Sequence, residues 1–125
     1  MRPVRLSLVL ACTLAALAPA SAQAPARTTI HLDSYHFMPN TLRLAAGKAV
    51  RLEFVNRSGK SHDFTAPQFF AASRILAGNP AGGEVELRSH EAARVDLIPA
   101  AGRYRVHCSH FLHAQLGMRA TILVE

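Results

Sequence analysis

Apolar and polar residues alternate with a period of two over several short stretches of the chain, which is typical of half-buried β-strands. The clearest case is the stretch 49–56, AVRLEFVN, where Val50, Leu52 and Phe54 fall on one face of a strand. Similar alternation between turn residues predicts further strands at 28–32, 41–44, 83–87, 91–98, 102–106 and 119–124. The pattern therefore favours a protein built from seven or eight short strands.

One internal stretch lacks this alternation. PQFFAASRILAG, residues 67–78, predicts a short helix with Pro67 in its first turn and Gly78 at its end. Its two aromatic residues, Phe69 and Phe70, are expected to pack against the strands and not to bind a ligand. The sum is an all-β fold, an antiparallel Greek-key β-sandwich with one short helix. A nucleotide-binding fold is not indicated, because a βαβ alternation and a glycine-rich phosphate loop are both missing.

The N-terminal residues 1–22 predict a secretory signal peptide. Arg2 and Arg5 precede an apolar run at 6–17, and the small residues before Gln23 suit cleavage after Ala22. The apolar run is shorter than the roughly 20 residues that cross a bilayer, so we expect no stable membrane insertion. We expect a periplasmic protein with a mobile tail at 23–27 and one domain at 28–125, of a size that is stable as a monomer.

Export would remove Cys12 and leave Cys108 as the single cysteine. An unpaired thiol is a liability in an oxidising compartment unless something holds it. Metal ligation is the most economical explanation, and a buried inert cysteine is the alternative. Nucleophilic catalysis is not indicated, because the sequence nominates neither an oriented base nor a substrate cleft. We therefore do not expect an enzyme.

The residues after Cys108 support metal ligation. In CSHFLHAQLGM, residues 108–118, His113 follows the cysteine by five positions and Met118 follows the histidine by five, between two predicted strands. Thiolate, imidazole and thioether suit copper that cycles between Cu(I) and Cu(II), provided that a second imidazole joins them. His62, at the end of the polar loop NRSGKSH, is the candidate for that position.

Each candidate has a plainer interpretation. His62 and His113 would otherwise be surface histidines, and Met118 would otherwise fill the core. His107 is expected to point away from Cys108 on its strand, and His110 is expected to have no special role. Three other histidines show no pattern that suggests a function: His31, His36 and His90.

The charge of the exported part is weakly basic. Without the two arginines of the leader, 12 basic residues stand against 8 acidic ones. The cations are scattered and form no run, so nucleic-acid binding is not indicated. Such a surface would favour encounter with an acidic partner protein or with an anionic membrane face.

The motifs resemble those of one family. NRSGKSHDF, followed by YRVHCSHFLHAQLGM and the final strand ATILVE, is similar to the cupredoxins, the plastocyanin- and azurin-like blue copper proteins. The small exported bacterial cupredoxin-domain proteins are the most similar members, and the resemblance covers essentially the whole chain after the leader. It implies one type 1 copper ion, held by His62, Cys108 and His113 with Met118 as a long axial ligand. It also implies a periplasmic carrier of single electrons between redox partner proteins.

Two positions depart from the cupredoxin pattern. Asp63 stands where many members have asparagine, and an ionised carboxylate beside the site would lower its reduction potential. His110 stands where the pattern often has Pro-Gly before the ligand histidine. The extra histidines leave open a different ligand choice or a second, looser metal position. They slightly favour an alternative function in copper storage, delivery or resistance, and a metal-free interaction domain is a third alternative.

Overall fold

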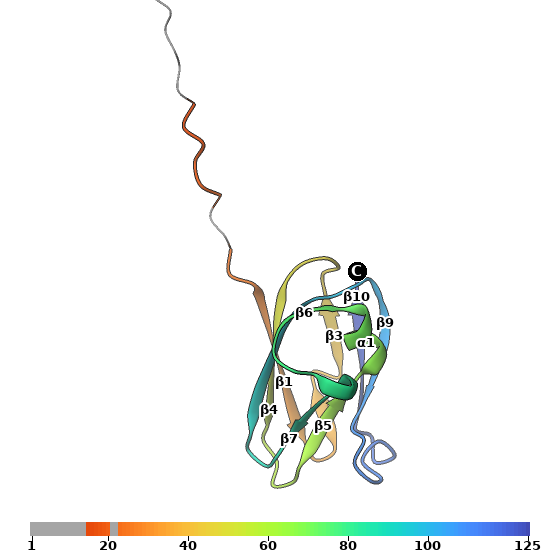
Figure 1. The fold of residues 1–125 in the computed structure, drawn as a ribbon. Coiled ribbons are helices and arrows are strands. Elements are labelled where there is room, and N and C mark those ends of the chain that lie inside the picture. Colours follow the sequence, from red (N-terminus) through yellow and green to blue (C-terminus); the bar gives the residue numbers. More distant parts are fainter. Residues whose placement is uncertain (1–14, 21–22) are drawn as a thin grey trace, which may run out of the picture.

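A computed structural model describes residues 15–20 and 23–125, and strands within residues 26–124 form two five-stranded sheets packed face to face (Figure 1). The predicted signal peptide lies mostly at 1–14 and 21–22, outside the described residues. In sheet order, the first sheet contains β2 (His36–Met38), β1 (Ala26–Asp33), β4 (Val50–Asn56), β8 (Ala92–Ile98) and β6 (Arg74–Ala77). The second contains β3 (Thr41–Leu44), β10 (Arg119–Val124), β9 (Gly102–His107), β5 (His62–Thr65) and β7 (Glu84–Leu87).

The core lies between the two sheets. The pattern of buried residues along the strands confirms the predicted alternation. On β4 the side chains of Val50, Leu52 and Phe54 are buried, while the residues between them are only partly buried. Phe64 on β5 lies at the aromatic centre of this core. Its ring centroid is 4.9 Å from that of Phe54 and 5.5 Å from that of Phe37. The prediction of an all-β sandwich with one short helix is therefore confirmed.

The sheets are not purely antiparallel. Strand β1 pairs in parallel with β4, and β3 pairs in parallel with β10, while the other pairings are antiparallel. These two pairings arise because β3 lies in the opposite sheet from β1 and β4, so the chain changes sheets twice before β4. Alternation within a strand defines its buried face but not the direction of its neighbour.

The helix is shorter than the sequence predicts. Helix α1 spans Pro67–Ala72, and the chain then becomes extended in β6, which pairs with the edge of β8. Ser73 ends the helix, because its backbone is extended and its hydroxyl donates to the carbonyl of Phe69 at 2.7 Å. The expectation that Phe69 and Phe70 pack in the core is confirmed, since both are buried. A short 3-10 turn, η1 (Ala81–Gly83), precedes β7. No helix in residues 15–20 and 23–125 has the length and apolar character to cross a membrane.

Three connections meet at one end of the sandwich. The β1–β2 turn, the β4–β5 loop and the long β9–β10 loop lie at the lower end of Figure 1, opposite the C-terminus. Each connects rigid strands, so side chains that are far apart in the sequence are brought together at this end.

Candidate metal centre

The structure brings together three of the predicted ligands, although they come from different segments of the chain. His62 is the first residue of β5, Cys108 follows the last residue of β9, and His113 lies in the β9–β10 loop. The Nδ1 atoms of His62 and His113 are 3.2 Å apart. The Cys108 Sγ atom is 3.4 Å from Nδ1 of His113 and 3.9 Å from Nδ1 of His62.

This triangle of donor atoms has the size that a bound metal ion requires. A point in its plane that is equally distant from the three atoms lies about 2.0 Å from each of them, which is the length of ordinary metal–imidazole bonds. Two nitrogens and one sulfur are also the donor set that suits copper in both of its common oxidation states. The residues present therefore fit a copper ion.

The local sequence explains why the thiol enters the site. Alternation along β9 buries Val106 and Cys108 and exposes His107 between them, which confirms that His107 points away. Two backbone hydrogen bonds close the following loop. The amide of Cys108 donates to the carbonyl of Met118 at 3.1 Å, and the amide of Met118 donates to that of His113 at 3.0 Å. The Met118 side chain is fully buried beside this closure, and its assignment as an axial ligand stays a prediction.

A serine fixes the orientation of the His62 ring. Ser34 Oγ, from the β1–β2 turn, lies 3.2 Å from Nε2 of His62. In the tautomer in which Nε2–H donates to this hydroxyl, Nδ1 carries the lone pair that faces the other two donors. Burial, together with the nearby His113 and His110, lowers the pKa of His62 to about 4. The ring is therefore neutral and able to bind a metal at neutral pH.

Cys108, like His62, is buried. Its side chain is 1% exposed, and burial raises the pKa of its thiol above the ordinary value. A bound cation reverses this preference, because metal coordination deprotonates a thiol. The backbone amide of Asp63 points at the sulfur with an N···S distance of 3.5 Å, and such a contact stabilises negative charge on the sulfur.

The Asp63 side chain ties two of the ligand-bearing segments together. Its Oδ1 atom accepts hydrogen bonds from the Ser109 amide at 2.8 Å and from the Thr65 hydroxyl at 2.7 Å. Its Oδ2 atom accepts a hydrogen bond from the Ser109 hydroxyl. The buried carboxylate thus joins β5 to the residue after Cys108. Both of its oxygens are thus engaged by hydrogen-bond donors, and one of them also lies within 4.8 Å of the Cys108 sulfur.

A second group of donor atoms shares the cysteine. Asp63, Cys108 and His110 also offer atoms within 4.8 Å of one another. In this group, however, the aspartate already accepts several hydrogen bonds, and His110 Nε2 lies 3.0 and 3.1 Å from the two carboxylate oxygens of Glu86. The first triangle fits a metal better, because its nitrogens contact no carboxylate.

Sequence reasoning missed the aromatic neighbour of His113. The Tyr35 ring packs edge-on against the His113 ring with centroids 4.8 Å apart, and His110 stacks on His113 at 5.4 Å and 14°. Tyr35 is itself held by Lys60, whose ammonium donates to the phenol oxygen at 2.8 Å. Ser34 and Tyr35 lie in a turn that no motif singled out, so no signal in the sequence pointed to them.

The rim around His113 is apolar and exposed. Phe111 is 87% exposed, Leu112 is 49% exposed and Leu116 is 58% exposed, all in the β9–β10 loop. Exposed apolar side chains in one loop are typical of a contact surface.

Comparison with known proteins identifies the domain. The family described as the cupredoxin-like domain matches residues 6–124. No curated protein matches the sequence at a significant level.

Solved structures agree with this fold. Auracyanin B superposes with a TM-score of 0.61 at 22% identity, over 83% of this chain and 92% of that one. Auracyanin A, a "blue" copper protein from Chloroflexus aurantiacus, gives 0.60 at 20% identity over 82% and 100%. The multicopper oxidase McoA from Aquifex aeolicus gives 0.65 at 17% identity, over 90% of this chain but 32% of that one. At these identities the likeness establishes the fold alone.

Proposed function

Because the chain belongs to the cupredoxin-like domain family, we propose that it binds one type 1 copper ion and carries single electrons between redox partners. The three near ligands are His62, Cys108 and His113, and Met118 is the long axial ligand. The observation that carries this proposal is the triangle of one sulfur and two nitrogens, whose sides of 3.2, 3.4 and 3.9 Å suit a single ion. Copper bound there would supply the one-electron couple.

The chain's own residues favour fast electron exchange. Ser34 fixes the His62 ring, the Asp63 carboxylate fixes Ser109 beside the cysteine, and two backbone hydrogen bonds close the loop that carries His113. A donor set that is held by a rigid sandwich moves little when the charge of the site changes. Such preorganisation keeps the cost of reorganisation low.

The electron would enter and leave through the rim of the β9–β10 loop. His113 is the one of the three donors that is only partly buried, and it lies among the exposed side chains of Phe111, Leu112 and Leu116. A redox partner that covers this apolar rim would exclude water above the ring and shorten the path to the metal. We also propose that the protein acts in the periplasm, after cleavage of its leader, as a monomer.

Copper storage or delivery is the second candidate, and the Asp63, Cys108 and His110 group is the observation that favours it. The two groups share the thiol, so one cysteine cannot hold two ions independently. Electron transfer is favoured because the His62–Cys108–His113 triangle is closed by rigid contacts, whereas a delivery site needs ligands that are easily exchanged.

Addition of Cu(II) to the purified mature protein tests the proposal. We expect an intense thiolate-to-copper charge-transfer band together with narrow copper hyperfine splitting in the electron paramagnetic resonance spectrum. A pale spectrum with ordinary hyperfine splitting would indicate the storage or delivery function instead. Failure to bind copper at all would contradict both.

The mutation Asp63→Asn should raise the reduction potential of the copper-loaded protein by tens of millivolts. Asparagine keeps an oxygen for the Ser109 amide, so the two segments stay joined, but the buried negative charge is lost. Negative charge near the ion favours Cu(II) over Cu(I), and its removal favours reduction. The potential is measured by redox titration of the charge-transfer band.

Asp96→Asn is the matched control for this measurement. It removes the same charge from β8 in the opposite sheet, where Asp96 pairs with Arg51 at 2.8 Å. The control should leave the potential nearly unchanged. Equal shifts in the two variants would show that Asp63 acts only through the overall charge of the protein.

A further inference from the structure

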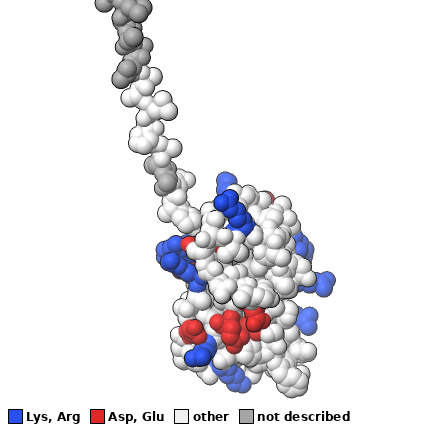
Figure 2. Space-filling view, viewed as in Figure 1, with Lys and Arg blue, Asp and Glu red and all other residues white. Residues whose placement is uncertain are grey.

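Arginines that are scattered in the sequence gather on one face of the second sheet. Adjacent strands β3, β10 and β9 expose a set that we call the arginine face: Arg43, Arg103, Arg105 and Arg119. Figure 2 shows basic side chains along the edge of the molecule where Figure 1 places β9, whereas the largest group of acidic side chains visible in that view lies over the region of β7. The charges of this sheet are therefore segregated.

The arginine face lacks acidic partners within the described part of the chain. Strands β3, β9 and β10 contain no aspartate or glutamate, and none of the four arginines forms an ion pair with a described residue. Glu125, just after β10, is the nearest acidic residue along these strands. By contrast, Arg27, Arg51 and Arg57 all pair with carboxylates. The positive charge of this face is thus uncompensated.

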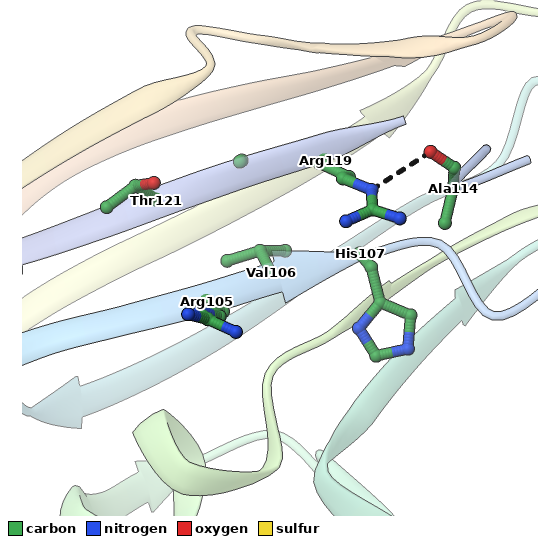
Figure 3. A pocket seen from close by; sticks show the side chains of 7 residues that line it. Arg105, Val106, His107, Ala114, Arg119 and Thr121 are labelled. Atoms are coloured by element: carbon green, nitrogen blue, oxygen red, sulfur yellow. Dashed lines mark hydrogen bonds between the residues drawn. The ribbon is translucent and has the colours of Figure 1, made fainter. Parts of the chain in front are cut away.

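Strand register concentrates the charge around a hollow. Arg119 lies directly opposite His107, and Arg105 lies directly opposite Thr121. These residues line a hollow of about 620 Å³ together with Ala114 of the β9–β10 loop (Figure 3). Arg105 and Arg119 are therefore diagonal neighbours on the two strands, and because their guanidinium groups repel, an anion bound between them would relieve an existing cost.

One guanidinium is already oriented for such contacts. Arg119 Nε donates to the carbonyl of Ala114 at 3.0 Å, as Figure 3 shows, which leaves the two terminal nitrogens available for a carboxylate. A second hollow, of about 320 Å³, is lined by Gln68, Arg103, Tyr104 and Arg105. Arg105 lines both hollows.

We propose that the arginine face is the docking surface for a redox partner protein with an acidic surface. The proposal rests on the electron-transfer function and adds the partner's chemistry and its place on the fold. The face extends over three strands, which suits a protein surface with several carboxylates. Ala114 belongs to the loop that carries His113, so the face is continuous with the apolar rim of the metal centre. Charge complementarity would steer the partner toward that rim and raise the association rate.

A titration of the mature apoprotein with hexaglutamate peptide at low ionic strength tests the surface by NMR. We expect amide shifts confined to β3, β9, β10 and the adjacent loop. The double variant R105Q/R119Q should weaken binding about tenfold, and added salt should do the same to the unmodified protein. The matched control R74Q/R88Q removes equal charge from outside this face and should change the affinity less than about twofold.

Three outcomes would overturn the proposal. Equal weakening of hexaglutamate binding by the two double variants would show a response to net charge alone. Inorganic phosphate could displace the peptide at equal concentration, which would indicate a small-anion site. Anionic phosphatidylglycerol vesicles could bind through the same arginines while hexaglutamate does not, which would indicate a membrane surface.

A kinetic measurement on the copper-loaded protein completes the test. Electron exchange with an acidic c-type cytochrome should slow about tenfold in R105Q/R119Q at low salt, with an unchanged charge-transfer band. An unchanged rate would overturn the docking role. The peptide titration uses no copper, so a failure of the electron-transfer function and a failure of the arginine face give different results.

Discussion

Replacement of Cys108 by serine should abolish the charge-transfer band of the copper-loaded protein completely. The band requires a thiolate bonded to copper, and Cys108 is the one free cysteine among the described residues. Serine has nearly the same shape, but its hydroxyl is far harder to deprotonate and is a poor ligand for Cu(I). His62 and His113 would still hold Cu(II), with a pale spectrum. Absorption spectra of the two proteins at equal copper loading measure the effect.

His110→Asn is the matched control for this substitution. It removes the histidine of the competing donor group, which contacts Glu86 and stacks on His113, but it leaves the triangle of His62, Cys108 and His113 intact. The band should persist in this variant. Survival of the band in Cys108→Ser, or its loss in His110→Asn, would contradict the ligand assignment.

Replacement of Phe64 by alanine should lower the free energy of unfolding by about 3–5 kcal/mol. The side chain is fully buried, and its ring lies within 6.2 Å of the rings of Phe37, Phe54 and Phe70. Truncation removes these contacts and leaves a cavity that two rigid sheets cannot close. The loss is a large fraction of the stability of a typical domain. Urea denaturation of the apoprotein measures it.

Phe111→Ala provides the control for the stability measurement. It is the same substitution in the β9–β10 loop, at a side chain that is 87% exposed, and it should change the stability by less than about 0.5 kcal/mol. A cost below about 1 kcal/mol for Phe64→Ala would show that the aromatic centre of the core is not closely packed.

Strand periodicity was sufficient to predict most of the sandwich. Alternation at Val50, Leu52 and Phe54 identified β4, because only one face of that strand is buried. It missed β5, where all four residues are buried, because a strand that is covered on both faces has no alternation. It also extended helix α1 across β6, since the edge pairing with β8 that makes residues 74–77 extended is a tertiary contact.

Ligand residues could be predicted where they lie close together in the sequence. Cys108 and His113 share one loop, so their spacing carried the signal. Ser34 and Tyr35 could not be found in this way, because only the fold places their turn against His62 and His113. The role of Asp63 depends on contacts with a residue 46 positions away.

The clustering of charge on the arginine face also could not be predicted from the sequence. Along the sequence the basic residues form no run, and they suggested no more than a weakly basic surface. Strand register places Arg105 and Arg119 on one face, because antiparallel pairing of β9 and β10 aligns Arg119 with His107 and Arg105 with Thr121. Sequence alone does not give the register of two strands, so it could not predict this clustering.

Crystallography of the copper-loaded mature protein, with anomalous diffraction at the copper edge, tests the central claim most directly. We expect a single copper peak within the triangle of His62 Nδ1, Cys108 Sγ and His113 Nδ1, about 2 Å from each atom, with the Met118 sulfur further away along the axis. A copper peak between Asp63, Cys108 and His110, away from His62 and His113, would contradict it.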